Sequence, residues 1–161
     1  MADIHITDFY RDIARILCQL YAGFPRKLTV FVEDISGPDD PDEFGLHSTR
    51  HQACFATLLW LADEGYLRYQ DTIRQEAIDQ ACLTHRGFTL LSAQLRCQSA
   101  LDTGATYVSG KLGGTPPSPV NDGDFAPTIE LLRDTLKGGS SAALEQIVQI
   151  VLNRDTQNGA V

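Results

Sequence analysis

The sequence has few of the features that mark membrane or secreted proteins. Its longest apolar stretch, residues 53–62 with one threonine inside it, is about half of the roughly 20 residues that a membrane-spanning helix needs. The opening residues MADIHITDFYRD carry acids where a secretory signal needs a cationic flank and an apolar run. The four cysteines show neither a C-x-x-C pair nor the spacing of a disulfide framework. We therefore expect a cytoplasmic protein that does not associate with membranes and keeps its thiols reduced and mostly buried.

Catalytic and cofactor motifs are also missing. The sequence contains no G-x-S-x-G, no H-E-x-x-H and no dinucleotide glycine fingerprint, and GKLGGTPP (110–117) lacks the Lys-Ser/Thr pair that closes a phosphate loop. His47, His51 and Cys54 are spaced i, i+4 and i+7, which suits zinc on a helix. No fourth ligand lies nearby, however, and Cys54 is better explained as a core residue. We predict that the protein is not an enzyme and uses neither a metal nor a cofactor.

Positive charge is scarce. The chain has 161 residues, the size of one domain, and its 21 acids against 13 lysines and arginines give a net charge of −8. This charge lowers the expectation of nucleic-acid binding, which then requires a local basic surface. Six of the acids fall in residues 33–43 among prolines and a glycine. We expect this segment to be a loop or a short helical turn, with the potential to dock a protein partner.

What the sequence does contain is hydrophobic periodicity, mostly helical. The expected elements are a helix over 8–22, a strand over 27–32, a helix over 49–64, strands over 66–69 and 80–83 around a polar connection, and a helix from 85 to about 101. The expected N-caps of the three helices are Thr7 or Asp8, Ser48 and Thr84.

The second half of the chain differs in composition. Residues 104–126 are rich in glycine and proline and indicate a linker or surface loop. Two short helices, over 127–137 and 141–153, form an expected α-hairpin. We therefore divide the chain into a domain over 1–103, a loop over 104–126, and a helical hairpin over 127–161 that packs on the domain or on a partner.

Two patterns around the second long helix resemble a known family. The residues are Leu58-x-x-Leu61-x-x-x-Gly65-Tyr66-Leu67 and, after a gap of wing length, Leu83-Thr84-x-x-Gly87. They resemble the winged helix-turn-helix domain of bacterial transcriptional regulators over roughly residues 8–100. Together with the α-hairpin, the resemblance implies a mostly α (α+β) fold with a small two-stranded wing. The second helix of such a domain should fall in 33–47, where acids and prolines leave room for only a very short helix or a loop.

The resemblance also implies a non-enzymatic regulator that binds double-stranded DNA through the 48–64 helix and the 68–80 wing. The candidate base contacts are Thr49 and Gln52, and the candidate phosphate contacts are Arg50, Arg68, Arg74, His85 and Arg86. The alternative is that all of these are solvated surface residues. The acidic 33–43 segment would lie near the DNA-facing side, where it disfavours binding.

Leu59 and Trp60 occupy positions that are usually polar in this pattern. Left exposed, they would form an apolar patch of a kind that monomers avoid. The last two helices or a second subunit could cover them, and we expect a homodimer with these residues as interface candidates. The alternative function is a winged-helix protein–protein interaction module, an acidic adaptor that does not bind DNA and uses the 33–43 loop and the Trp60 surface.

Overall fold

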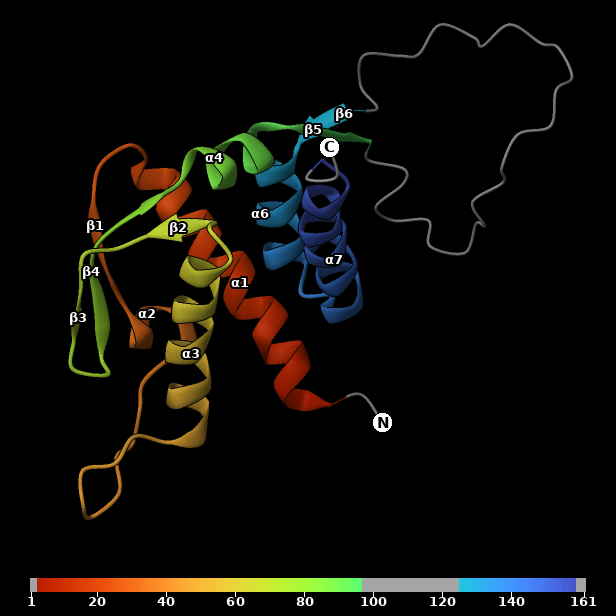
Figure 1. Cartoon of the computed structure of the whole chain (residues 1–161). Helices are drawn as coiled ribbons and strands as arrows, with labels where there is room; N and C mark the ends of the chain where they lie inside the picture. Colours follow the sequence, from red (N-terminus) through yellow and green to blue (C-terminus); the bar gives the residue numbers. More distant parts are fainter. Residues whose placement is uncertain (1–2, 97–124, 159–161) are drawn as a thin grey trace, which may run out of the picture.

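The structure, a computed structural model, describes residues 3–96 and 125–158. Over these residues the chain is mixed α+β, with six helices and small antiparallel sheets (Figure 1). The elements are α1 (Ile4–Gly23), β1 (Leu28–Phe31), α2 (Val32–Ser36), α3 (Thr49–Asp63), β2 (Leu67–Arg68), β3 (Asp71–Ile73), β4 (Ala77–Leu83), α4 (His85–Ser92), β5 (Gln94–Arg96), β6 (Phe125–Pro127), α6 (Thr128–Gly138) and α7 (Ser141–Asn158).

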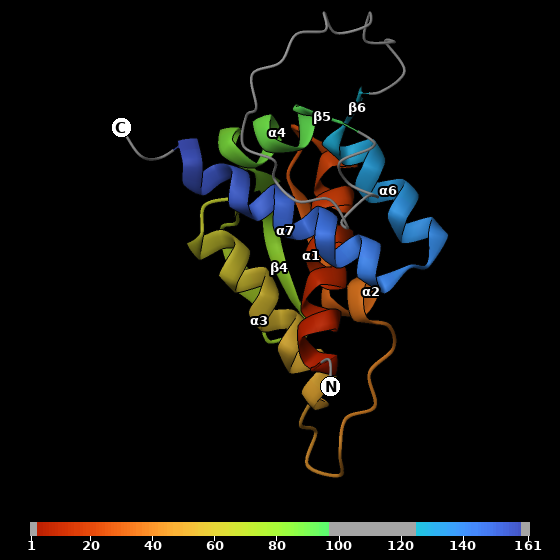
Figure 2. The same cartoon turned by 90° about the vertical axis from the view of Figure 1, so that its right-hand side faces the viewer.

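Helix α1 lies at the centre of the fold. It packs against α3 on one side and against α6 and α7 on the other, and α7 crosses it in the view of Figure 2. The buried residues of α1 recur at helical spacing and form one apolar stripe: Ile13, Ile16, Leu17 and Leu20. The α6–α7 pair is the expected α-hairpin, and it completes the core with Leu132, Ile147, Val148 and Val151.

Strand β4 is the central strand of the main sheet. It pairs antiparallel with β1, β2 and β3, in the order β1-β4-β2, with β3 alongside β4. The register places Leu28 opposite Ala81 and Leu67 opposite Leu83. Five of the seven residues of β4 are buried, more than in any of its partner strands, and the strand packs against α1.

The corner after α3 is formed by Gly65 in the left-handed conformation and is held by Thr84. Gly65 has a φ of +79°, and the amide of Tyr66 donates to the carbonyl of Leu61 over 2.9 Å, which closes the end of the helix. The hydroxyl of Thr84 donates to the carbonyl of Gly65 and accepts from the amide of Gly87. Thr84 therefore both caps α4 and fastens it to the corner. A Cβ on Gly87 would lie 2.1 Å from the carbonyl oxygen of Tyr66, which explains the need for glycine there.

Helix α3 begins where predicted, since the hydroxyl of Ser48 accepts from the amide of His51. Other boundaries were wrong. Helix α1 begins at Ile4, not at residue 8, and neither Thr7 nor Asp8 caps it. Its first turn escaped the periodicity because Ile4 and Ile6 face solvent and not the core. Of the two expectations for residues 33–47, a very short helix or a loop, the structure shows the five-residue α2 followed by non-helical chain up to Ser48.

Three strands were missed, β3, β5 and β6. Residues 71–73, expected to be part of a polar connection, form β3; its side chains are exposed, and it is held by backbone pairing with β4. The helix after Thr84 ends at Ser92 and does not reach residue 101. Leu95 instead lies in β5, which pairs with β6 at residues 125–127. Of the expected 104–126 loop, residues 104–124 lie outside the described residues.

Two expectations on membranes and thiols can be compared with the structure. No helix in the described part of the chain is both long enough and apolar enough to span a membrane. Cys54 and Cys82 are buried, Cys18 is half-buried, and all three are free thiols. Burial raises the pKa of Cys18 to about 11 and that of Cys54 to about 12. Cys97 lies outside the described residues.

Candidate interaction surface on helix α3

Helix α3 has one face in the core and one at the surface. Cys54, Leu58 and Leu61 are fully buried. On the opposite face Thr49, Gln52, Ala53, Ala56 and Asp63 are exposed and Trp60 is half-buried. Since alanines occupy the middle of the outward face, nothing on α3 itself fills the space above them.

This space is a groove between α3 and the first turns of α1. Its volume is about 930 Å³. The apolar lining comes from Ile4, Ile6 and Phe9 on α1 and from Ala53, Ala56 and Trp60 on α3. The groove is open to solvent beside Ile4, which is 79% exposed. The groove is therefore an exposed apolar surface built by two helices.

Trp60 forms one end of the groove. Its ring meets the ring of Phe9 edge-on, with centroids 5.2 Å apart, and lies 6.5 Å from the ring of Tyr66. The ring contact thus comes from α1, whereas α6 and α7 pack against α1 and α4. Leu59 is half-buried against the core. Phe9 and Tyr66 of the same chain therefore cover part of the Trp60 side chain, and the part that faces the groove remains accessible.

Arg50 is bound within the fold. Its guanidinium donates two hydrogen bonds to Asp12 of α1, at 2.7 and 2.5 Å, and its Nε lies 3.6 Å from Asp8. The Asp12 side chain is 1% exposed and that of Arg50 is 32% exposed. The hydrogen bonds to Asp12 raise the pKa of Arg50. Asp8 and Asp12 lie one turn apart on the same face of α1, but nothing in the sequence relates them to Arg50, which is 38 residues from Asp12.

The other residues expected to bind DNA are spread over several elements. Thr49 lines the groove, and Gln52 donates its side-chain amide to the carbonyl of His47. Arg68 is exposed on β2, Arg74 is exposed in the turn after β3, and His85 is exposed at the start of α4.

Arg86 lies at the corner after α3. It donates to the carbonyl of Glu64 over 2.7 Å, and its guanidinium lies over the ring of Tyr66 at 4.9 Å. Its side chain is therefore held against the fold by two contacts.

The groove is bordered by negative charge. Asp3, Asp8 and Asp12 are among its lining residues, and the only lysine or arginine among them is Arg50, which pairs with the buried Asp12 and lies near Asp8. The acids of the 33–43 segment divide into two kinds. Asp40, Asp42 and Glu43 are all exposed, but only the carboxylate of Asp42 is seen to accept from loop amides, those of Phe44 and Leu46, and so to hold the loop together.

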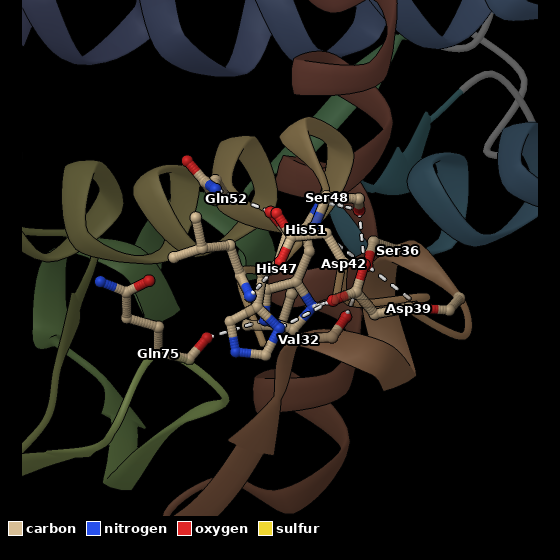
Figure 3. Close-up of polar contacts among 11 residues, drawn as sticks. Val32, Ser36, Asp39, Asp42, His47, Ser48, His51, Gln52 and Gln75 are labelled. Atoms are coloured by element: carbon tan, nitrogen blue, oxygen red, sulfur yellow. Dashed lines mark hydrogen bonds and ion pairs between the residues drawn. The ribbon is translucent and has the colours of Figure 1, made fainter. Parts of the chain in front are cut away.

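The described residues contain one cluster with the donor atoms of a metal site. The ligand atoms of Asp39, His47 and His51 all lie within 4.8 Å of one another (Figure 3). Cys54, which the sequence grouped with these histidines, packs in the hydrophobic core instead. The third member of the cluster is instead Asp39, which lies in a loop that the sequence indicated to be solvated. This partner was missed because the fold brings the acidic loop back onto the start of α3.

The carboxylate of Asp39 is buried and hydrogen bonded on both oxygens. Oδ1 accepts from the hydroxyl and the amide of Ser48, and Oδ2 accepts from Nδ1 of His47 over 2.7 Å. The hydrogen bond from the Ser48 hydroxyl is the main reason that the pKa of Asp39 falls to about 2.

Comparison with known proteins adds no relative: no family model matches the sequence, and no curated protein and no solved structure matches it.

Proposed function

We propose that the chain is a winged-helix protein–protein interaction module whose α1–α3 groove binds a cationic amphipathic helix of a partner protein. The observation that carries the proposal is the outward face of α3. It borders an apolar groove, and its one arginine is bound to Asp12.

The winged-helix assignment rests on the order and pairing of the elements. Helix α1, strand β1, short helix α2, helix α3 and the β2–β4 hairpin follow in the order of that fold. The last strand of the hairpin lies between β1 and β2 in the sheet, so that the wing packs beside the helix it follows. Gly65 and the Thr84–Gly87 corner supply the local geometry that this arrangement needs.

A helix is the occupant that the shape of the groove favours. Two helices form its walls, and its floor is made by the short side chains of Ala53 and Ala56 with Trp60 at one end. An amphipathic helix places residues i, i+3, i+4 and i+7 along such a groove. A tryptophan that is only half-buried, as Trp60 is, is a frequent anchor residue of protein interfaces.

The charge around the groove favours a basic partner. Asp3 and Asp8 lie at its edge, and the whole chain has a net charge of −8. Complementary charge at the rim would speed association and select the partner. A second copy of the chain is a poorer occupant, because two molecules of −8 repel each other. The homodimer expected from the sequence is therefore the less favoured occupant, and the sedimentation experiment below tests it.

The test compares two arginine substitutions on the exposed face of α3. Ala56→Arg places a bulky cation inside the groove, whereas Gln52→Arg adds the same side chain outside it. The probe is a labelled leucine/lysine amphipathic peptide of roughly 18 residues, about five helical turns. We expect Ala56→Arg to weaken peptide binding at least about tenfold and Gln52→Arg to leave it within about twofold, since only the arginine at position 56 would fill the groove.

Equal affinities for both variants, or no binding of this peptide above that of a scrambled sequence, would contradict the proposal. Sedimentation of the unmodified chain reports whether a second copy competes for the site.

DNA binding is the second candidate function, and the exposure of Arg68, Arg74 and His85 on β2, the wing and α4 favours it. The same two variants separate it from the first. Both add a cation to the proposed recognition helix, so both should strengthen binding to duplex DNA at low salt and steepen its salt dependence. If the unmodified chain binds genomic fragments and Arg74→Ala weakens this binding, the DNA role gains support over the adaptor role.

A further inference from the structure

One nitrogen of His51 is buried without a hydrogen-bond partner. The side chain is 2% exposed, and its Nδ1 has no partner among the described residues. Its other nitrogen, Nε2, lies 2.8 Å from the carbonyl oxygen of Gln75. Because a carbonyl only accepts hydrogen bonds, Nε2 carries the proton, and Nδ1 of the neutral ring carries a lone pair.

This lone pair points toward a carboxylate. Nδ1 of His51 lies 3.6 Å from Oδ2 of Asp39, which is too long for a hydrogen bond. The Asp39 side chain is itself 2% exposed. When the His51 ring is neutral, two acceptors therefore face each other in a buried place, an arrangement that repels unless a proton or a metal ion lies between them. Figure 3 shows His47 beside the same carboxylate. The rings of His47 and His51 are stacked, with their centroids 4.0 Å apart.

We propose that Asp39, His47 and His51 bind one divalent first-row transition-metal ion of the Zn²⁺ type. The donors would be Nδ1 of each histidine and Oδ2 of Asp39. Two imidazoles and one carboxylate suit zinc, cobalt, nickel or iron, whereas magnesium and calcium prefer oxygen donors alone. With three protein ligands, solvent completes the coordination on the side of His47, which is partly exposed.

The distances fit an ion after a small movement of one ring. Two donors about 2.1 Å from a tetrahedral ion lie roughly 3.4 Å apart. The separation of 3.6 Å between His51 and Asp39 is close to this value. His47 lies 2.7 Å from Asp39 and so moves outward as its Nδ1 gives up the proton that it shares with the carboxylate.

The surrounding hydrogen bonds are those that orient metal ligands. Gln75 fixes the tautomer of His51, and Ser48 holds Oδ1 of Asp39 so that Oδ2 faces the histidines. Since Asp39 belongs to the acidic loop, His51 to α3, and Gln75 to the turn before β4, the ion would tie these three segments together. Ordering of the loop beside α3 is the expected consequence.

The test measures binding of metal ions to the full chain after removal of metal with a chelator. Calorimetry should give one Zn²⁺ or Co²⁺ per chain and at least about tenfold weaker binding of Mg²⁺. Asp39→Asn and His47→Gln should each weaken Zn²⁺ binding at least about tenfold, while His85→Gln, an exposed histidine on α4, should not. Far-ultraviolet circular dichroism checks that each variant is folded.

A second measurement needs no variant. In the NMR spectrum, Zn²⁺ should shift the ring signals of His47 and His51 and leave those of His5 and His85 in place. The proposal is wrong if the chain does not bind Zn²⁺ more tightly than Mg²⁺, or if these ring signals do not move on binding. It is equally wrong if bound Co²⁺ shows a thiolate charge-transfer band, which would place the ion on a cysteine.

Discussion

Replacement of Arg50 by alanine should destabilise the fold through the carboxylate that it leaves behind. Asp12 is 1% exposed and takes both of its strong hydrogen bonds from Arg50. Removal of one partner from a fully buried ion pair costs about 3–5 kcal/mol. Since the Arg50 side chain is 32% exposed, water can reach Asp12 once the arginine is gone, and we expect the lower end, about 3 kcal/mol. With a urea m-value of about 2 kcal/mol per M, the midpoint of unfolding falls by about 1.5 M.

Three further variants separate this mechanism from a general loss of charge. Asp12→Ala removes the buried charge itself and leaves Arg50 near Asp8 and water, so it should cost only about 1–2 kcal/mol. The double variant Asp12→Leu/Arg50→Met should be more stable than Arg50→Ala, because no buried charge remains. Arg68→Ala removes an exposed arginine and should change stability by less than about 0.5 kcal/mol. Urea unfolding followed by circular dichroism measures all four. If Arg50→Ala costs no more than Arg68→Ala, Arg50 does not neutralise a buried acid and the reasoning fails.

Two predictions concern packing and pH. Gly87→Ala should lower the free energy of unfolding by about 1–3 kcal/mol, because the new Cβ would clash with the carbonyl oxygen of Tyr66. Gly138→Ala is the control: a Cβ there has no atom within 4 Å, so this variant should be neutral or slightly stabilising. If urea unfolding gives equal effects for the two variants, the clash does not exist. The pKa of Cys54 is raised by burial from 9.0 to about 12, so the unfolded chain loses this thiol proton first. Its contribution to stability is complete below pH 9 and declines as the pH rises toward 12, and Cys54→Ala should make the decline of stability above pH 9 shallower. Unfolding curves from pH 7 upward measure this decline in the free energy of unfolding. If the decline is equally steep in Cys54→Ala and in the unmodified chain, Cys54 is not protected from ionisation by the fold.

The elements that the sequence predicted well are those with local signals. Helix α3 has a side-chain cap at Ser48, an apolar stripe, and a glycine in the left-handed conformation at its end. Each of these features depends on residues within a few positions of each other. The α6–α7 hairpin is similar, because its helices are amphipathic and the turn between them contains glycine.

The features that the sequence missed depend on distant partners. Strand β3 has no buried side chain and exists because β4 offers backbone partners. Leu95 fits a helical stripe, but residues 125–127 pair with its segment as a strand. Tertiary pairing overrides local propensity in both cases.

The same limit applies to the candidate sites. The sequence did not reveal the pair of Arg50 and Asp12, because the two residues are 38 positions apart and no local pattern relates them. Arg50 was therefore expected to contact phosphate. The Asp39 cluster was missed for the same reason, since the carboxylate is supplied by a loop whose composition indicates only solvation. Thr49 and Gln52 lie at the surface of α3 as expected, but the groove was not predicted, because α1 forms its other wall.

The measurement that tests the proposed function most directly is the fluorescence of Trp60. It is the only tryptophan in the chain, and it lines the groove, so its emission reports on the groove alone. Titration with the leucine/lysine amphipathic peptide should shift this emission to shorter wavelength with saturation, because the indole loses contact with water. A version with glutamate in place of lysine should have little effect. If duplex DNA changes the emission with saturation and the cationic peptide does not, the groove is not a helix-binding site and the account is contradicted.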